Sequence, residues 1–354
     1  MNLNTSISYN INIVENVTKN YSQSENHADG EPLLIKKIHD GIIVFILITI
    51  MLAMGCNITL PQIWNKLRRP VGVAISLTCQ FLLLPLAAFA LMNILHLPAL
   101  FSIGMLIVSS CPGGVVSNVF TFFCNGDVAL SVTMTTASTV VAIGMMPFTL
   151  WVYGHALDTK DIIIPYTNMT LTLLVVTVPV CVGILVHWKL PRVARVATKV
   201  GSYCGFALIV IVVGMQYYIF PKMLAKVPWQ QCVASLFLPI LGLVLGFSGA
   251  AVFRQTAPVR RTIALEVGIQ NTGAALTVST LSFPFEVQDQ VLVCPVLFGL
   301  VQFGACCLAS LTYRIYKRWF KAQIVEDENI ESLGQVKNHQ GVIKLEQSHD
   351  ESHA

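Results

Sequence analysis

The chain has 354 residues, of which 55% are hydrophobic and only 11% are charged. An average soluble domain carries about 25% charged residues, so a soluble core could not hide this much apolar surface. The composition excludes a soluble enzyme and predicts a multi-pass membrane protein. The net charge of +4 is too small to indicate nucleic-acid binding.

Residues 1–37 are predicted to form an extracellular tail. The segment has no apolar stretch of the kind that a cleavable signal peptide needs. It carries three Asn-x-Ser/Thr sequons, at Asn4, Asn16 and Asn20, which favour a glycosylated segment outside the cell.

Residues 38–320 are predicted to form an all-α transmembrane domain. A helix needs about 20 apolar residues to cross the hydrocarbon core of a bilayer. By this measure the sequence predicts nine transmembrane helices, at 40–60, 71–94, 100–124, 128–153, 163–186, 198–219, 229–252, 260–284 and 288–313. Residues 321–354 are polar and are predicted to be a disordered cytoplasmic tail.

The distribution of basic residues predicts the orientation. Most of the 22 Lys and Arg residues fall in loops on one side of the nine spans, and this side is expected to be cytoplasmic. The five tryptophans lie at span ends, as in the aromatic belts of membrane proteins. The sequence therefore predicts a plasma-membrane protein with its N-terminus outside and its C-terminus in the cytoplasm.

Two of the predicted spans are interrupted. The third contains Pro112-Gly113-Gly114, which removes a backbone donor and adds backbone freedom. The eighth contains Glu266, Gln270 and Asn271 beside two glycines. Spans 2–4 and 7–9 would correspond with opposite orientations, which is the inverted-repeat plan of secondary transporters. Alternatively, both interruptions are ordinary kinks and their pairing is coincidence.

Glu266 is the only acidic residue predicted to lie deep within a span, since the others fall in tails, loops or span ends, and no Lys or Arg deep within a span can pair with it. An unpaired carboxylate in a membrane is expensive, so we expect it to be protonated or neutralised by a bound cation. The nearby oxygen ligands come from Gln80, Ser131, Thr135, Ser138, Gln270 and the carbonyls of Val267 and Ile269. Such hard ligands suit an alkali cation. We therefore favour sodium over a proton, although a single Ser or Thr often bonds only its own helix.

In these same segments the chain resembles the sodium/bile acid cotransporter family, and within it the carriers of the ileum and of sulfated steroids. The motifs that carry the resemblance span residues 40–320 and are Met54-Gly55-Cys56-Asn57, Arg69-Pro70, Cys79-Gln80-Phe81, Cys111-Pro112-Gly113-Gly114, Ser117-Asn118, Gly126-Asp127, Met134-Thr135-Thr136, Gly144-Met145-Met146-Pro147 and Glu266-Val267-Gly268-Ile269-Gln270-Asn271.

The resemblance implies two sodium sites that share Glu266, and a core domain that moves past a panel domain. The first site would comprise Ser117, Asn118, Ser131, Thr135 and Glu266, and the second Gln80, Glu266, Gln270 and the carbonyls of Val267 and Ile269. Asn118 and Asn271 would face the substrate cavity. Sodium would be the co-substrate and no other cofactor is implied.

The function expected from this resemblance is electrogenic symport of about two sodium ions with one amphipathic organic anion, a bile salt or a sulfated steroid. A ligand-sensing membrane receptor is the alternative from another class, although nine spans and a polar cluster divided over four helices disfavour it. A channel fits an inverted repeat poorly. An intramembrane enzyme is not expected, because no histidine accompanies the one deep carboxylate.

Overall fold

A computed structural model describes residues 30–56, 64, 66, 68, 70–156, 166–198, 214–215, 218–219 and 227–319. Over these residues the chain is helical, and the one β-type pairing is an isolated antiparallel bridge between Gly113 and Gln270. The predicted all-helical architecture is therefore confirmed for this part. The sequons at Asn4, Asn16 and Asn20 and the C-terminal tail lie outside the described residues.

Within the described ranges, six helices are long and apolar enough to cross a membrane. Three of them are α2 (Gly30–Cys56), α8 (Val128–Gly154) and α9 (Tyr166–Lys189). A fourth is continuous over Val71–Leu95 and comprises α4 (Val71–Thr78), the π-helical turn η1 (Cys79–Leu83) and α5 (Leu84–Leu95). The last two are α11 (Trp229–Val252) and Val287–Trp319, which begins in α14 (Phe285–Val291). A short helix at 191–198 follows α9.

The two spans predicted to be interrupted are each broken into a pair of short helices. The third consists of α6 (Ala99–Ser109) and α7 (Val116–Phe123). The eighth consists of α12 (Ala257–Gly268) and α13 (Thr272–Ser282). The predicted span 198–219 lies almost entirely outside the described residues, so the count of nine remains a prediction.

Each break has a local cause. Pro112 cannot donate a helical hydrogen bond, so α6 ends shortly before it. In the other pair, Ile269 adopts an extended backbone conformation at the end of α12. The side chain of Asn271 then starts the next helix by accepting a hydrogen bond from the backbone N–H of Ala274 at 3.0 Å.

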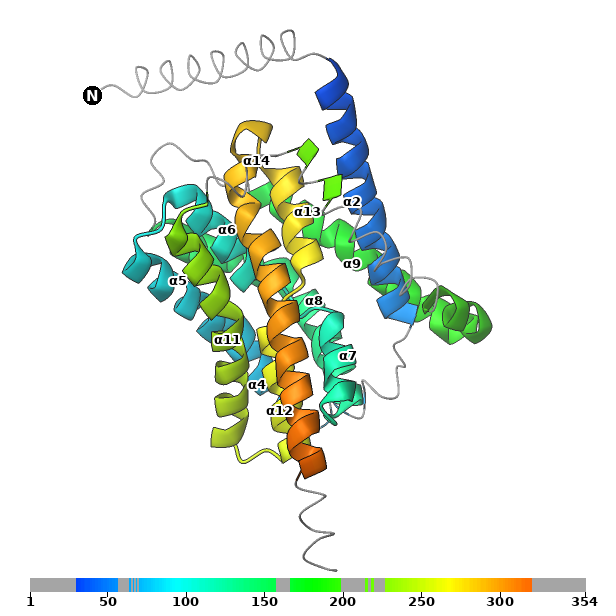
Figure 1. Cartoon of the computed structure of the whole chain (residues 1–354). Coiled ribbons are helices and arrows are strands. Elements are labelled where there is room, and N and C mark those ends of the chain that lie inside the picture. Colours follow the sequence, from blue (N-terminus) through cyan, green and yellow to red (C-terminus); the bar gives the residue numbers. More distant parts are fainter. Residues whose placement is uncertain are drawn as a thin grey trace, which may run out of the picture.

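The helices form two groups (Figure 1). α2 and α9 pack along each other at one edge of the molecule. Their backbones approach so closely that a Cβ atom on Gly55 would overlap the carbonyl of Val180, and one on Gly183 the carbonyl of Leu52. The other described helices, from α4 to α8 and from α11 to residue 319, make the larger group. Its centre is an apolar core that includes Met105, Met146 and Phe298, and Met169 and Leu173 of α9 also pack into this core.

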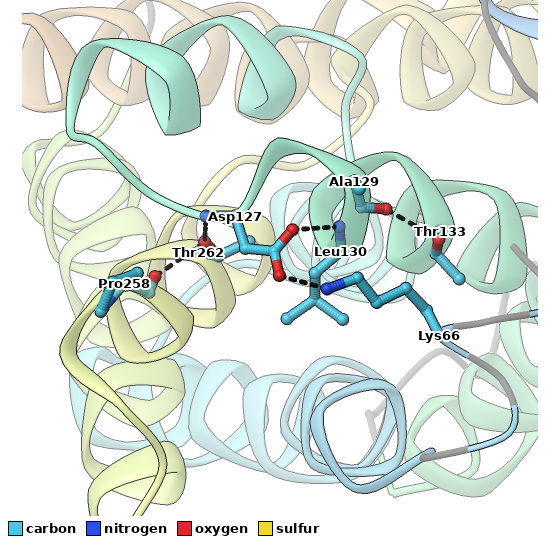
Figure 2. Close-up of polar contacts among 7 residues, drawn as sticks. All are labelled: Lys66, Asp127, Ala129, Leu130, Thr133, Pro258 and Thr262. Carbon is cyan, nitrogen blue, oxygen red and sulfur yellow. Dashed lines mark hydrogen bonds and ion pairs between the residues drawn. The ribbon is translucent and has the colours of Figure 1, made fainter. Parts of the chain in front are cut away.

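At one end of the larger group, the turn between α7 and α8 bonds the segment before α4 and helix α12 (Figure 2). Asp127 caps α8 by accepting a hydrogen bond from the backbone N–H of Leu130 at 2.9 Å, and its other oxygen pairs with Lys66. The backbone N–H of Asp127 donates to Thr262 Oγ1 at 2.8 Å. The segment before α4, the start of α8 and helix α12 thus meet around one carboxylate.

Candidate functional site

The two breaks cross each other in the middle of the larger group. The backbone N–H of Gly114 donates to the carbonyl of Ile269 at 2.9 Å, and that of Asn271 donates to the carbonyl of Pro112 at 2.9 Å. Backbone groups freed by a broken helix need partners at membrane depth, because no lipid can supply them. Here each break supplies partners for the other.

Side chains from three further helices satisfy the backbone at the crossing. The N–H of Gly113 donates to Ser138 Oγ on α8 at 3.1 Å, and Gln80 Nε2 of η1 donates to the carbonyl of Cys111 at 3.2 Å. The N–H of Gln270 donates to Gln302 Oε1 at 2.9 Å. Gln302 was not among the predicted site residues, although an amide in the middle of the apolar span 288–313 was a signal that could have found it.

Glu266 lies at the end of α12, fully buried, and three hydroxyl groups surround its carboxylate. Ser117 of α7 donates to Oε2 at 2.7 Å. From α8, Ser131 donates to Oε2 at 3.2 Å and Thr135 donates to Oε1 at 2.6 Å. The structure thus brings together four of the five residues predicted for the first ion site.

No basic side chain neutralises this carboxylate in the part of the chain that the structure describes. The ion pairs found there join His39 to Asp40 and Lys66 to Asp127. Hydroxyl donors stabilise a carboxylate through neutral dipoles and leave its full negative charge in place. A positive charge to balance this carboxylate would therefore have to come from a proton or a metal cation.

A second polar cluster adjoins the crossing. Gln80 Nε2 lies 3.3 Å from Gln270 Oε1, and Gln270 Nε2 donates to the carbonyl of Val267 at 2.8 Å. Gln80 is fully buried, and its Oε1 has no hydrogen-bond partner among the described residues. The carbonyl of Ile269 already accepts from Gly114. The structure therefore places Gln80, Gln270, Val267 and Ile269 in one neighbourhood with an unused amide oxygen.

The two asparagines predicted to face substrate have different surroundings. Asn118 follows Ser117 on α7, and its Oδ1 is buried with no partner within the described part of the chain. No hydrogen bond joins it to Glu266 there. Asn271 caps α13, and its Nδ2 lies 4.0 Å from the sulfur of Met51 on α2. This asparagine therefore lies where the crossing meets the α2–α9 group.

A multi-pass helical membrane protein whose broken helices cross beside a buried, unpaired carboxylate has the features of a secondary transporter. The sequence model of the Sodium Bile acid symporter family matches residues 44–220, and the chain belongs to this family. It is 36% identical over 277 residues to the sodium-dependent organic anion transporter of Homo sapiens, covering 77% of this chain and 72% of the relative.

Two ileal sodium/bile acid cotransporters are also similar. The human protein is 33% identical over 299 residues, which cover 83% of this chain and 86% of the relative. The protein of Oryctolagus cuniculus is 33% identical over 286 residues, which cover 80% of this chain and 82% of the relative. These matches confirm the family that the sequence motifs resembled.

Proposed function

We propose that this protein is a sodium-coupled symporter that carries amphipathic organic anions, bile salts or sulfated steroids, into the cell. The observation that carries the proposal is the carboxylate of Glu266, fully buried and bonded by three hydroxyls with no basic partner among the described residues. Relatives over 30% identical are named as sodium-dependent carriers of organic anions and of bile acid. A sodium ion on Glu266 explains both facts.

Two sodium sites account for the two polar clusters. The first is Ser117, Asn118, Ser131, Thr135 and Glu266, and the second is Gln80, Glu266, Gln270 and the carbonyls of Val267 and Ile269. Each set includes a buried amide oxygen, Asn118 Oδ1 or Gln80 Oε1, that has no partner within the described residues. Buried polar atoms are normally paired, so an unpaired acceptor in each cluster supports a bound cation in each.

Sodium binding would couple to transport through the crossing. Cations on both clusters would hold the broken helices in the geometry that accepts the anion at Asn118 and Asn271. Access would alternate as the larger helix group moves past α2 and α9, within an inverted repeat of nine spans. Coupling requires that sodium favours the conformation that substrate also favours.

The proposed stoichiometry makes transport electrogenic. Two sodium ions and one monoanion move one net positive charge, which is worth about 2.3 kcal/mol for each 100 mV of membrane potential. The corresponding topology is a plasma-membrane protein with an external N-terminus, since the basic loops then face the cytoplasm.

Tracer uptake in expressing cells tests the proposal. Radiolabelled taurocholate and a steroid sulfate would be supplied separately, each in sodium medium and in choline medium, with vector-transfected cells as the control. We expect sodium-dependent accumulation of at least one tracer, and the preferred tracer names the substrate class. Uptake that is the same in choline would overturn sodium coupling, and ligand-evoked signalling without accumulation would favour a receptor.

A further inference from the structure

After a turn at Leu292, the last membrane-spanning stretch continues as helix 293–319. A basic pocket lies at the end of the molecule where this helix finishes. It has a volume of about 270 Å³ and is lined by Phe123, Asn125, Tyr313, Arg314, Lys317 and Arg318. No acidic residue lines it. Arg314, Lys317 and Arg318 are exposed, and none of the three has a hydrogen-bond or ion-pair partner within the described ranges.

Aromatic rings and a fixed arginine make the pocket a defined structure. The guanidinium of Arg314 lies over the ring of Phe123, 4.8 Å from its centre, and that of Arg261 lies over Tyr313 at the same distance. Arg261 also donates to the carbonyls of Cys124 and Asn125 at 2.8 and 2.9 Å. Two of its donors therefore hold the end of α7 to α12, and its guanidinium packs against Tyr313 of the last helix, while Arg314, Lys317 and Arg318 are exposed.

An apolar groove adjoins this pocket. One section, of about 330 Å³, lies between α11, α12 and helix 293–319, and another, of about 610 Å³, continues between α11 and that last helix. Leu243 and Ala309 line both apolar sections, and Tyr313 lines these two and the basic pocket. The three hollows are therefore neighbours around one tyrosine, with the cations at one end.

We propose that this composite site binds an anionic phospholipid, with its phosphate headgroup on Arg314, Lys317 and Arg318 and an acyl chain in the groove. Arginine and lysine are the side chains that bind phosphate best. A fully polar ligand would make no favourable contact with the apolar groove. Only an amphiphile with an anionic head at the water boundary complements both parts.

The position of the site agrees with this ligand. The α7–α8 turn, the start of α12 and the end of helix 293–319 lie at the same end of the molecule (Figure 1). In the orientation proposed above, this end faces the cytoplasmic leaflet, which carries the anionic lipids, and basic pockets between helices on that side suit their headgroups. The competing occupant is the chain's own acidic segment at Glu326, Asp327 and Glu328, which lies outside the described residues.

Lipid binding can be measured on the purified full-length protein in phosphatidylcholine-containing micelles. A fluorescent phosphatidylinositol bisphosphate is titrated and its anisotropy followed. We expect the triple variant Arg314→Gln, Lys317→Gln, Arg318→Gln to bind at least tenfold more weakly. The matched control replaces Lys189, Arg192 and Arg195, three exposed cations elsewhere, by glutamine and should stay within twofold of the parent. Equal effects of both triple variants, or no effect, would overturn the site.

Two further measurements separate the lipid from other occupants. The substitution Ala309→Trp fills the groove and should weaken binding of the lipid. Soluble inositol trisphosphate, which has no acyl chain, should bind weakly to both the parent protein and the Ala309→Trp variant. If the soluble headgroup binds as tightly as the lipid, the groove is not part of the site. If the lipid binds only after the chain is truncated beyond Ala322, the acidic tail is the occupant and the proposal fails. A thermal melt of each variant verifies folding.

Discussion

Gly113 and Glu266 lie so close together that a methyl group on the glycine would overlap Oε1 of the carboxylate. The glycine belongs to the break between α6 and α7, and the glutamate ends α12, so the contact joins two halves of the sequence. Any side chain at this position would force the carboxylate to move, because the break between α6 and α7 passes directly beside it. The close approach therefore suggests a sharp test of the proposed ion site.

The substitution Gly113→Ala should reduce sodium-driven uptake by tenfold or more, because the added methyl group must displace the carboxylate from its hydroxyl donors. Gly144→Ala is the matched control, since a Cβ atom there meets nothing within 4 Å. Uptake would be normalised to surface protein measured by biotinylation. Equal uptake by the two variants would show that the position of the carboxylate is unimportant for transport.

The substitution Glu266→Gln keeps the shape of the side chain and one oxygen but removes the charge. We expect sodium-driven uptake to fall to near background while surface expression stays close to that of the parent. The physical reason is that the neutral amide no longer attracts a cation strongly enough to displace its hydration shell. Transport at the full rate would rule out the carboxylate as a cation ligand.

The hydroxyl of Thr135 should contribute to sodium affinity, since it makes the shortest hydrogen bond to the carboxylate, at 2.6 Å. A hydrogen bond to a charged group is worth about 1.5–3 kcal/mol, so Thr135→Val should raise the sodium concentration for half-maximal uptake by roughly tenfold or more. Among the described residues, the neighbouring Thr136 bonds only the carbonyl of Val132 in its own helix, at 2.7 Å. Thr136→Val should leave the sodium dependence unchanged, and a similar shift in both variants would contradict the assignment.

The second cluster can be tested through the shape of the sodium dependence. If Gln80 supplies an oxygen to a second ion, the parent should show a sigmoidal dependence of uptake on sodium concentration. Gln80→Leu should then bring the Hill coefficient from near two towards one. The substitution removes the unpaired Oε1 while keeping a side chain of similar size. A Hill coefficient that does not change would exclude Gln80 from the second site.

Asp127 and Lys66 offer a test of stability that is independent of transport. Asp127→Ala removes the cap of α8 and should lower the free energy of unfolding by about 0.5–2 kcal/mol. The ion pair is partly exposed, with relative side-chain exposures of 34% for Lys66 and 25% for Asp127, so Lys66→Met should cost less than about 1 kcal/mol. Denaturation of the purified variants gives both values. A larger loss for the lysine variant would mean that the ion pair, and not the cap, stabilises this turn.

Much of the architecture could be predicted because it follows from local physics. Long apolar stretches must be helices in a membrane, and Pro112-Gly113-Gly114 cannot continue one. Glu266 could be singled out because burying a carboxylate in the membrane without a basic neighbour has a high free-energy cost. These arguments need no knowledge of which helices touch. They predicted both broken spans and placed the hydroxyls of Ser131 and Thr135 near the carboxylate, which both of them bond. Ser117, which also bonds it, was expected only from the family resemblance.

The rest depends on contacts between distant segments. Ser138 shares a face with Ser131 and Thr135 but does not bond the glutamate among the described contacts. Its hydroxyl accepts from the N–H of Gly113 and donates to the carbonyl of Thr135 in its own helix. Gln302 reaches Gln270 from the last helix. The π-helical turn at Cys79–Leu83 was also not predicted. It precedes Pro85, which has no N–H to donate, and it carries Gln80 into the crossing.

The antiparallel bridge between Gly113 and Gln270 also constrains how the protein can move. Separating the two half-helix pairs would break the hydrogen bonds from Gly114 to Ile269 and from Asn271 to Pro112, and the lipid offers no replacement partners. No backbone bridge of this kind joins the crossing to α2 among the described residues, and the asparagine of the crossing meets that helix through a weak contact with a methionine sulfur. In the proposed transport cycle, the four half-helices should therefore move together as one rigid unit.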